Sequence, residues 1–403
     1  MTSTEDIQAL ETKHVLQTYK RQPVTFVRGE GVRLYDVDGR EYLDLLSGIG
    51  VASLGHAHPG LARAIADQAK ILLHTSNLFF HPLQGQAAER LARLSGLPRT
   101  FFCNSGAEAT EACLKFARRY WYTRGERRPE IIALQGAFHG RTMGALSMTW
   151  DEHYRQPFGP LLEGVKWIPA NDSAALAAAV SGATAAIIAE PIQGEGGVRP
   201  LTPPFAAAIT EACQKTGALL IVDEVQSGLG RTGRAFYFQA LGLQPHLVSV
   251  GKALGGGVPI GAALVSEMVA DTIAFGDHGS TYGGNLLACR AAICVLDELI
   301  GGGLIAHVEK VGRYFESRLN SMASTRPIVK DVRGSGLIWG VELDRDASAI
   351  VPAALERGLI VNRTADRVVR LLPPLVISEA DAALGLDRLE QALDAVVQGG
   401  QQK

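Results

Sequence analysis

Short apolar runs alternate with helical patterns along the middle of this 403-residue chain. Residues 61–73 and 84–94 repeat apolar side chains at helical spacing, whereas the apolar runs are only four or five residues long. These runs are residues 100–103, 131–134, 185–189, 218–222 and 247–250. Short buried strands separated by helices are typical of an α/β fold with a mainly parallel sheet. We therefore predict that fold class.

The two ends of the chain have different patterns from its middle. Near the N-terminus, an alternating segment at residues 32–37 and the turn Asp38-Gly39 predict a β-hairpin. After about residue 305, the pattern predicts a long amphipathic helix, a strand around residues 336–343 and a final helix from about Glu379. We expect residues 1–54 to contribute to a small α+β domain. Residues 55–305 would form a large domain, and residues 306–403 the rest of the small one.

The composition argues against several classes of function. The chain has 39 basic and 41 acidic residues, a net charge of −2, which gives no reason to expect nucleic acid or a membrane as partner. Its 5 cysteines form no C-x-x-C pair, so we expect reduced thiols in the cytoplasm rather than disulfides or zinc. No apolar run reaches the roughly 18 residues of a membrane helix. The acidic N-terminus is unlike a secretory signal.

Polar motifs directly follow four of the apolar runs, where α/β folds bind ligands. They are Asn104-Ser105-Gly106-Ala107-Glu108, Phe138-His139-Gly140-Arg141, Asp223-Glu224 and Gly251-Lys252. The first motif opens a helical pattern, and the N–H groups of a helix start suit a phosphate, although an ordinary serine cap has the same sequence. Asp223 ends an apolar run, where a carboxylate needs a cation such as a protonated pyridine nitrogen. The alternatives are that it pairs with an arginine or caps a loop.

Lys252 lies at the mouth of a predicted buried strand, before the glycines 255–257. Desolvation at such a position lowers the pKa of a lysine and favours the neutral amine that forms Schiff bases. A lysine that contacts phosphate or solvent would have similar neighbours. These two interpretations remain open on this residue alone.

Other familiar motifs do not fit. The segment 228–233 matches G-x-G-x-x-G, but no Asp or Glu occurs between Glu224 and Glu267 to bind a ribose. Gly251-Lys252 lacks the remaining residues of a P-loop. His56 and His58 lie in Gly55-His56-Ala57-His58-Pro59 without a clear third ligand, so we expect a structural turn and no metal site.

Taken together, the motifs resemble those of the class III (ω-amino acid) aminotransferases, and among them the acetylornithine aminotransferases. The segments that carry the resemblance are 55–59, 104–109, 137–141, 190–197, 222–228, 252–257 and 278–285. The likeness extends from about Gln22 to the last helix. It implies fold type I, pyridoxal 5′-phosphate (PLP) as cofactor, and a homodimer with shared active sites.

The resemblance also assigns residues to the cofactor. Lys252 would form the Schiff base with PLP, and Asp223 would bind the pyridine nitrogen. The other cofactor residues would be Phe138 against the ring, Gln226 beside O3′, and Ser105, Gly106 and Ala107 at the phosphate, with Thr281 donated by the neighbouring subunit. Family members often have threonine at the position of Ala107, but the backbone N–H remains.

On the substrate side, the resemblance implies that Arg141 and Ser280 bind substrate, and that Arg370 binds the α-carboxylate of glutamate or 2-oxoglutarate. Glu195 would cover Arg370 when an ω-amine is bound. Ile49 aligns with a substrate-binding tyrosine of the related ornithine aminotransferases. An apolar side chain at that position favours an acetylated substrate over a free α-ammonium group.

We therefore expect δ-amino transfer from N-acetylornithine to 2-oxoglutarate, giving N-acetylglutamate semialdehyde and glutamate, as in arginine biosynthesis. Alternative donors are succinylornithine, ornithine, 4-aminobutyrate and diaminobutyrate. A PLP racemase or mutase on the same fold is a second class, and a non-catalytic binder is a third. Arg370 with Glu195 favours two-substrate transamination, and Lys252 with Asp223 argues against a mere binder.

Overall fold

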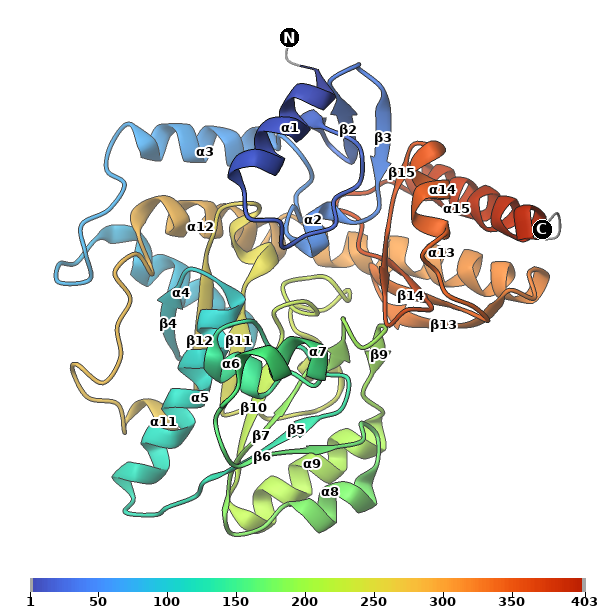
Figure 1. Ribbon diagram of the computed structural model, residues 1–403. Coiled ribbons are helices and arrows are strands. Elements are labelled where there is room, and N and C mark those ends of the chain that lie inside the picture. The colour runs from blue at the N-terminus through green and yellow to red at the C-terminus, as the bar shows by residue number, and fades with distance from the viewer. Residues whose placement is uncertain (1–2, 401–403) are drawn as a thin grey trace.

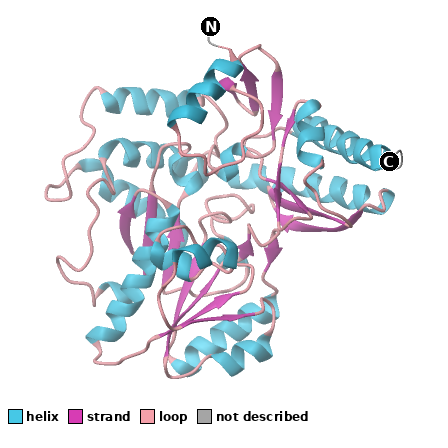
Figure 2. Ribbon diagram, viewed as in Figure 1, coloured by secondary structure: helices cyan, strands magenta, loops and turns pink. Residues whose placement is uncertain are grey.

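The computed structural model describes residues 3–400, and a seven-stranded sheet forms the centre of the molecule (Figures 1 and 2). The strand order is β4-β12-β11-β10-β7-β5-β6. Every strand except β12 runs in the same direction, because β12 is antiparallel to both of its neighbours. The strands are β4 (Arg99–Cys103), β5 (Glu130–Leu134), β6 (Val165–Ile168), β7 (Thr184–Ala189), β10 (Leu219–Asp223), β11 (Leu247–Val250) and β12 (Gly261–Val265). The predicted mainly parallel α/β sheet is confirmed.

All five apolar runs form strands of this sheet, but two strands were not predicted. Strand β6 lies at the sheet edge, pairs only with β5, and is only partly buried, so it lacks a continuous apolar run. Strand β12 is fully buried, but its sequence Gly-Ala-Ala-Leu-Val begins with small residues that are not typical of strands. Its antiparallel direction depends on the path of the chain rather than on its composition.

Alternate residues of the strands enter two separate hydrophobic cores. Ile131 and Ala133 pack with helix α5 (Gly106–Thr123), whereas Ile132 and Leu134 enter the core on the opposite face. That second core contains side chains from α4 (Pro82–Ser95), α8 (Ser173–Ala179), α9 (Pro203–Thr216) and α12 (Leu286–Ile300). Because both faces are covered by helices, the inner strands are mostly apolar, with polar residues such as Asp223 and Glu130 at their ends.

The beginning and the end of the chain meet in a second region. The predicted hairpin is present as β2 (Arg33–Asp36) and β3 (Glu41–Asp44), with β1 (Phe26–Glu30) beside β2. Strand β3 also pairs in parallel with β15 (Leu359–Ile360) from the C-terminal part. The predicted long helix, strand and final helix are α13 (Leu304–Thr325), β14 (Ile338–Leu343) and α15 (Glu379–Gly400). The domain boundaries near 54 and 305 stay a prediction.

The remaining elements are short or peripheral, and Figure 1 shows the C-terminal ones at the right. Strand β14 lies in a sheet of order β13-β14-β17-β16, in which neighbouring strands are antiparallel. Helix α3 ends at residue 69 rather than near 73. The remaining bounds are α1 (Thr4–His14), α2 (Ser47–Gly50), α3 (Pro59–Ala69), α6 (Met143–Ser147), α7 (Glu152–Arg155), η1 (Gln156–Phe158), β8 (Ile192–Gln193), β9 (Arg199–Pro200), α10 (Tyr237–Ala240), η2 (Lys252–Gly255), α11 (Glu267–Ala270), β13 (Val329–Ser335), α14 (Ile350–Glu356), β16 (Asn362–Thr364) and β17 (Val368–Leu371).

Among residues 3–400, no single helix has the length and apolar character needed to cross a membrane. Helices α12 and α13 pass that test only as a pair, and they are bent by 67° relative to each other. Most residues of α12 are buried in the core of the large sheet, which accounts for its apolar sequence.

Candidate active site

The four polar motifs follow the carboxyl ends of β4, β5, β10 and β11, which all lie on the same side of the sheet because these strands are parallel. Lys252 directly follows β11 and Gly251, and its φ of 39° is in the left-handed region. Side chains with a Cβ adopt that region only when their surroundings hold them there, which is common at functional sites. Burial lowers the pKa of Lys252, and the charges of Glu195 and Asp223 only partly oppose this effect. Lys252 is thus an amine suited to act as a nucleophile.

Asp223 ends β10 and is only 4% exposed. Its Oδ2 lies 2.8 Å from Nδ1 of His139, and its Oδ1 accepts the backbone N–H of Val225 at 3.1 Å. Burial acts to lower the pKa of His139, but the hydrogen bond and charge of Asp223 outweigh it and raise the pKa. Asp223 is therefore paired with a histidine rather than with an arginine, and it is positioned to accept a hydrogen bond from a ligand cation.

The start of helix α5 forms an anion cradle beside these residues. Ser105 is the N-cap, and its hydroxyl accepts the N–H of Glu108 at 3.2 Å. The N–H groups of Gly106 and Ala107 have no acceptor within the part of the chain that the structure describes. A Cβ on Gly106 would lie 2.6 Å from Cγ1 of Val225, so only glycine fits there. These free donors and the positive helix end fit the phosphate of PLP.

Phe138 follows β5 and is held by a buried carboxylate. The backbone N–H of Phe138 donates to Oε1 of Glu190 at 2.9 Å, and the N–H of Gly194 donates to Oε2 at 3.2 Å. Burial raises the pKa of Glu190 to about 7, against the opposing effects of the His139 charge and the two N–H groups. Glu190 thus connects the loop of Phe138 to the loop that carries Glu195.

Arg370 on β17 comes from the C-terminal part and is only 1% exposed. Its Nη1 donates to Oε1 of Glu195 at 2.5 Å and to Oε1 of Gln226 at 3.1 Å, while its Nε donates to Asn362 at 3.2 Å. Burial would raise the pKa of Glu195, but the charge and hydrogen bond of Arg370 lower it. The structure therefore brings Arg370, Glu195 and Gln226 together.

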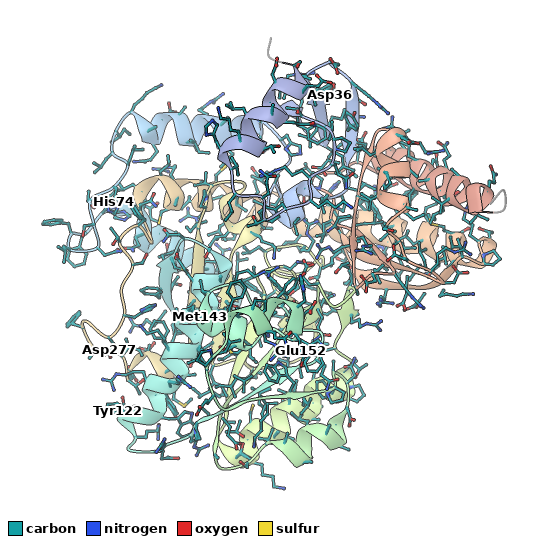
Figure 3. The ribbon with its side chains drawn as sticks, viewed as in Figure 1. Asp36, His74, Tyr122, Met143, Glu152 and Asp277 are labelled. Atoms are coloured by element: carbon teal, nitrogen blue, oxygen red, sulfur yellow. The ribbon has the colours of Figure 1, made fainter. Side chains whose placement is uncertain are left out.

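A cavity of about 600 Å³ opens beside Phe138 and Glu195. Arg141 lies near it, with its guanidinium carbon 3.5 Å from the ring centroid of Tyr154, which lines the cavity. Figure 3 labels Glu152, another lining residue, on helix α7 at the near side of the molecule. The cavity therefore borders the site at Phe138 and Glu195.

Ser280 and Thr281 lie on the loop that precedes α12. The hydroxyl of Ser280 accepts the N–H of Gly283 at 2.9 Å and lies 3.3 Å from Nδ2 of Asn104, just before α5. Thr281 is exposed. Ser280 thus lies near the anion cradle of its own chain, whereas Thr281 faces outward.

Two residues of the site were not assigned a role from the sequence. His139 belongs to a quoted motif, but its partner Asp223 is 84 residues away. Glu190 follows the apolar run of β7 in the same way that Asp223 follows β10, so the strand-end rule could have identified it. The excluded G-x-G-x-x-G segment forms turns and opens no helix, in agreement with that exclusion.

Comparison with known proteins places this arrangement in a family. Residues 15–393 match the family described as Aminotransferase class-III. The acetylornithine aminotransferase of Methanocaldococcus jannaschii is 46% identical over 391 residues, which cover 96% of each chain. An ornithine aminotransferase structure from Toxoplasma gondii, described with partial PLP occupancy at its active site, has a TM-score of 0.95 and 35% identity, covering 100% of this chain and 96% of that one. The acetylornithine aminotransferase structure from Elizabethkingia anophelis has a TM-score of 0.87 and 32% identity, covering 98% and 99%.

Proposed function

Since this chain belongs to the class III aminotransferases, which depend on PLP, we propose that it transfers the δ-amino group of N-acetylornithine to 2-oxoglutarate. The products are N-acetylglutamate semialdehyde and glutamate, and the reaction serves arginine biosynthesis. The observation that carries this proposal is the Arg370–Glu195 pair beside Lys252. A buried arginine with a movable acidic partner suits an enzyme that binds two different substrates in turn. The acetylornithine aminotransferases among the relatives support the choice of donor.

PLP supplies an electron sink for the substrate carbon that loses a proton. Lys252 would hold the cofactor covalently between turnovers, and its amine would then carry the proton as general base and acid. Asp223 holds the ring nitrogen in its protonated form through a charge-assisted hydrogen bond. His139 orients Asp223 through their 2.8 Å contact.

The remaining cofactor residues bind and orient. Ser105 and the free N–H groups of Gly106 and Ala107 would bind the phosphate, and Phe138 would pack on the ring. Gln226 binds the ring oxygen O3′. The cavity beside Phe138 and Glu195 is the space through which the substrate would enter. These assignments follow from the resemblance and are supported by the convergence of the residues at the sheet edge.

The proposed substrate-binding residues act in different half-reactions. Arg370 binds the α-carboxylate of glutamate or 2-oxoglutarate once Glu195 has moved away. With acetylornithine bound, Glu195 remains on Arg370 and neutralises its charge. Arg141 and Ser280 bind the far end of the donor. The Glu195 side chain is 36% exposed, compared with 1% for Arg370, so Glu195 is the partner with more room to move.

The choice between acetylornithine and ornithine depends on Ile49. Ile49 is 41% exposed and lies in the turn next to Lys252. Its apolar side chain can lie against an acetyl group, but it cannot pair with the α-ammonium group of ornithine. An unpaired buried charge costs several kcal/mol, and about 1.4 kcal/mol corresponds to a factor of ten. The T. gondii structure leaves ornithine as the second candidate.

A panel of ω-amines with 2-oxoglutarate tests the substrate. We expect kcat/KM for N-acetylornithine to exceed that for ornithine by roughly two orders of magnitude. Ile49→Tyr should reduce this ratio, whereas the similar-sized Ile49→Leu should preserve it. Equal kcat/KM values for the two amines in the wild type would refute N-acetylornithine as the preferred donor. The assignment of the chain to its family would not be affected.

We also propose a homodimer in the cytoplasm. Residues 71–80 and the loop before α12 lie on the left in Figure 1, and both expose large apolar side chains; we refer to them as the exposed face. Asn77 joins the two loops by donating to the carbonyls of Ser280 and Gly283. Phe80 and Phe275 are fully exposed there, and large apolar side chains exposed on neighbouring loops are typical of a protein interface. The five unpaired cysteines support a reducing location.

Thr281 lies in this face, and the family resemblance implies that it would reach the phosphate cradle of a second copy seated there. Within each copy, we propose that residues 1–54 and 306–403 form the small domain and residues 55–305 the large one. The parallel pairing of β3 with β15 supports this division, because it joins the first segment to the last.

A further inference from the structure

The turn Ser47–Gly50 has four consecutive residues with positive φ. The values are 47° for Ser47, 62° for Gly48, 64° for Ile49 and 78° for Gly50. This conformation suits glycine, but it is unfavourable for serine and still more for a β-branched residue such as isoleucine. It persists only where the surrounding structure holds it in place.

A buried carboxylate holds the beginning of this turn. Asp44 ends β3 and is only 1% exposed. Its Oδ1 accepts the backbone N–H groups of Leu46 and Ser47, each at 2.8 Å. Its Oδ2 lies 2.8 Å from Nε2 of His56, so His56 donates to it. His56 therefore holds the carboxylate that binds the amides of Leu46 and Ser47 at the beginning of the turn.

The segment Ser47–Gly50 also lies beside Lys252. A Cβ added to Gly50 would lie 4.0 Å from Cδ of Lys252, which is ordinary van der Waals distance. Ser47 Oγ donates to the carbonyl of Leu372 at 2.6 Å, and Ser53 Oγ donates to the carbonyl of Ala253 at 3.3 Å. A shift of the turn would therefore change the wall beside Lys252 and the position of Ile49.

The two histidines of the segment 55–59 have separate tasks. His58 is the N-cap of α3, and its ring accepts the N–H of Leu61 at 3.2 Å. His56 instead points to Asp44. We propose that His56 and Asp44 form a positioning pair that holds the left-handed turn against Lys252 and thereby sets the selectivity between donor amines. This inference rests on the proposed aminotransferase function, and it assigns a role to a histidine that has no contact with the cofactor residues.

Asp36 offers a matched control in the same part of the chain. Its Oδ1 also accepts two backbone N–H groups, from Asp38 and Arg40, and its Oδ2 accepts a side-chain donor, Tyr42. Figure 3 shows Asp36 in the hairpin near the top of the molecule, away from the large sheet. Asp36→Asn therefore perturbs an equivalent buried carboxylate without touching the turn.

The experiment compares the PLP-loaded His56→Leu, His56→Gln, Asp44→Asn and Asp36→Asn variants with the wild type. The first readout is the ratio of kcat/KM for N-acetylornithine to that for ornithine. The second is hydrogen exchange of the backbone amides of Leu46 and Ser47, which needs no substrate. Losing a hydrogen bond to a charged group should change each quantity by about tenfold in His56→Leu.

Glutamine can still donate to Asp44, so His56→Gln should keep the kcat/KM ratio and the amide exchange rates close to those of the wild type. Asp36→Asn should leave both within twofold of wild type. If His56→Leu does not fold, Asp44→Asn keeps an acceptor for the two amides and should still change the ratio. An unchanged ratio with unchanged exchange in a folded variant overturns the positioning pair. A wild type without ω-amine activity would instead overturn the proposed function, so the two failures are distinguishable.

Discussion

At the scale of single residues, Lys252 is expected to have two tasks, covalent attachment of the cofactor and proton transfer. Lys252→Ala should abolish turnover, because proton transfer alone contributes roughly 10²–10⁴-fold and the covalent role is lost as well. PLP should still bind through Asp223 and the start of α5. Steady-state activity and cofactor content measure both effects, with Lys310→Ala on the surface of α13 as control. Near-normal activity in Lys252→Ala would contradict the assignment.

Asp223 is expected to keep the ring nitrogen of the cofactor protonated. Asp223→Asn removes the charge but keeps the shape, so the first half-reaction should slow strongly in single-turnover absorbance measurements. The same change should lower the pKa of His139, because burial then acts without the opposing carboxylate charge. Titration of His139 by NMR measures that shift. A half-reaction rate within a few-fold of wild type would mean that another group holds the nitrogen.

Arg370 is expected to distinguish the two half-reactions. Arg370→Ala should impair the glutamate and 2-oxoglutarate half-reaction far more than the acetylornithine half-reaction, since only the former presents an α-carboxylate to it. Glu195→Gln should shift the balance toward glutamate, because the charge of Arg370 is then no longer neutralised. Rapid-mixing absorbance measures each half separately. If Arg370→Ala slows both half-reactions equally, Arg370 does not act in the glutamate and 2-oxoglutarate half-reaction alone.

At the scale of elements, the start of helix α5 depends on close packing. Gly106→Ala would place a Cβ 2.6 Å from Val225, so the helix start must move and its free N–H groups lose their alignment. We expect PLP affinity to fall by about tenfold, the equivalent of one misaligned charge-assisted hydrogen bond. The double variant Gly106→Ala/Val225→Ala removes the clashing methyl groups and should recover affinity. Failure of this rescue would show that the contact is not the cause.

At the scale of the whole molecule, the exposed face that includes Phe80 and Phe275 is expected to hold two copies together. The double variant Phe80→Asp/Phe275→Asp should sediment as a monomer, because burying carboxylates in an apolar interface is unfavourable. Its PLP affinity should also fall, since Thr281 would no longer reach a second copy. Phe158→Asp, an exposed phenylalanine elsewhere, is the control. A double variant that remains dimeric would show that the copies meet elsewhere.

The local features of this protein were predictable from its sequence. Five of the seven strands of the large sheet show as apolar runs, the hairpin shows at Asp38-Gly39, and the strand-end position marks Asp223 and Lys252. Each of these depends on the burial or backbone preference of neighbouring residues. The motifs also identify the family, because seven segments match in one order along nearly the whole chain.

Tertiary structure alone decided which distant residues meet. Arg370 contacts Glu195 across 175 positions, and Ser47 contacts Leu372 across 325. The direction of β12, the pairing of His139 with Asp223 and that of His56 with Asp44 likewise follow from how the chain folds back on itself. Local patterns contain no information on such contacts, because hydrogen bonds and charges act over a few ångströms in space whatever the separation along the chain.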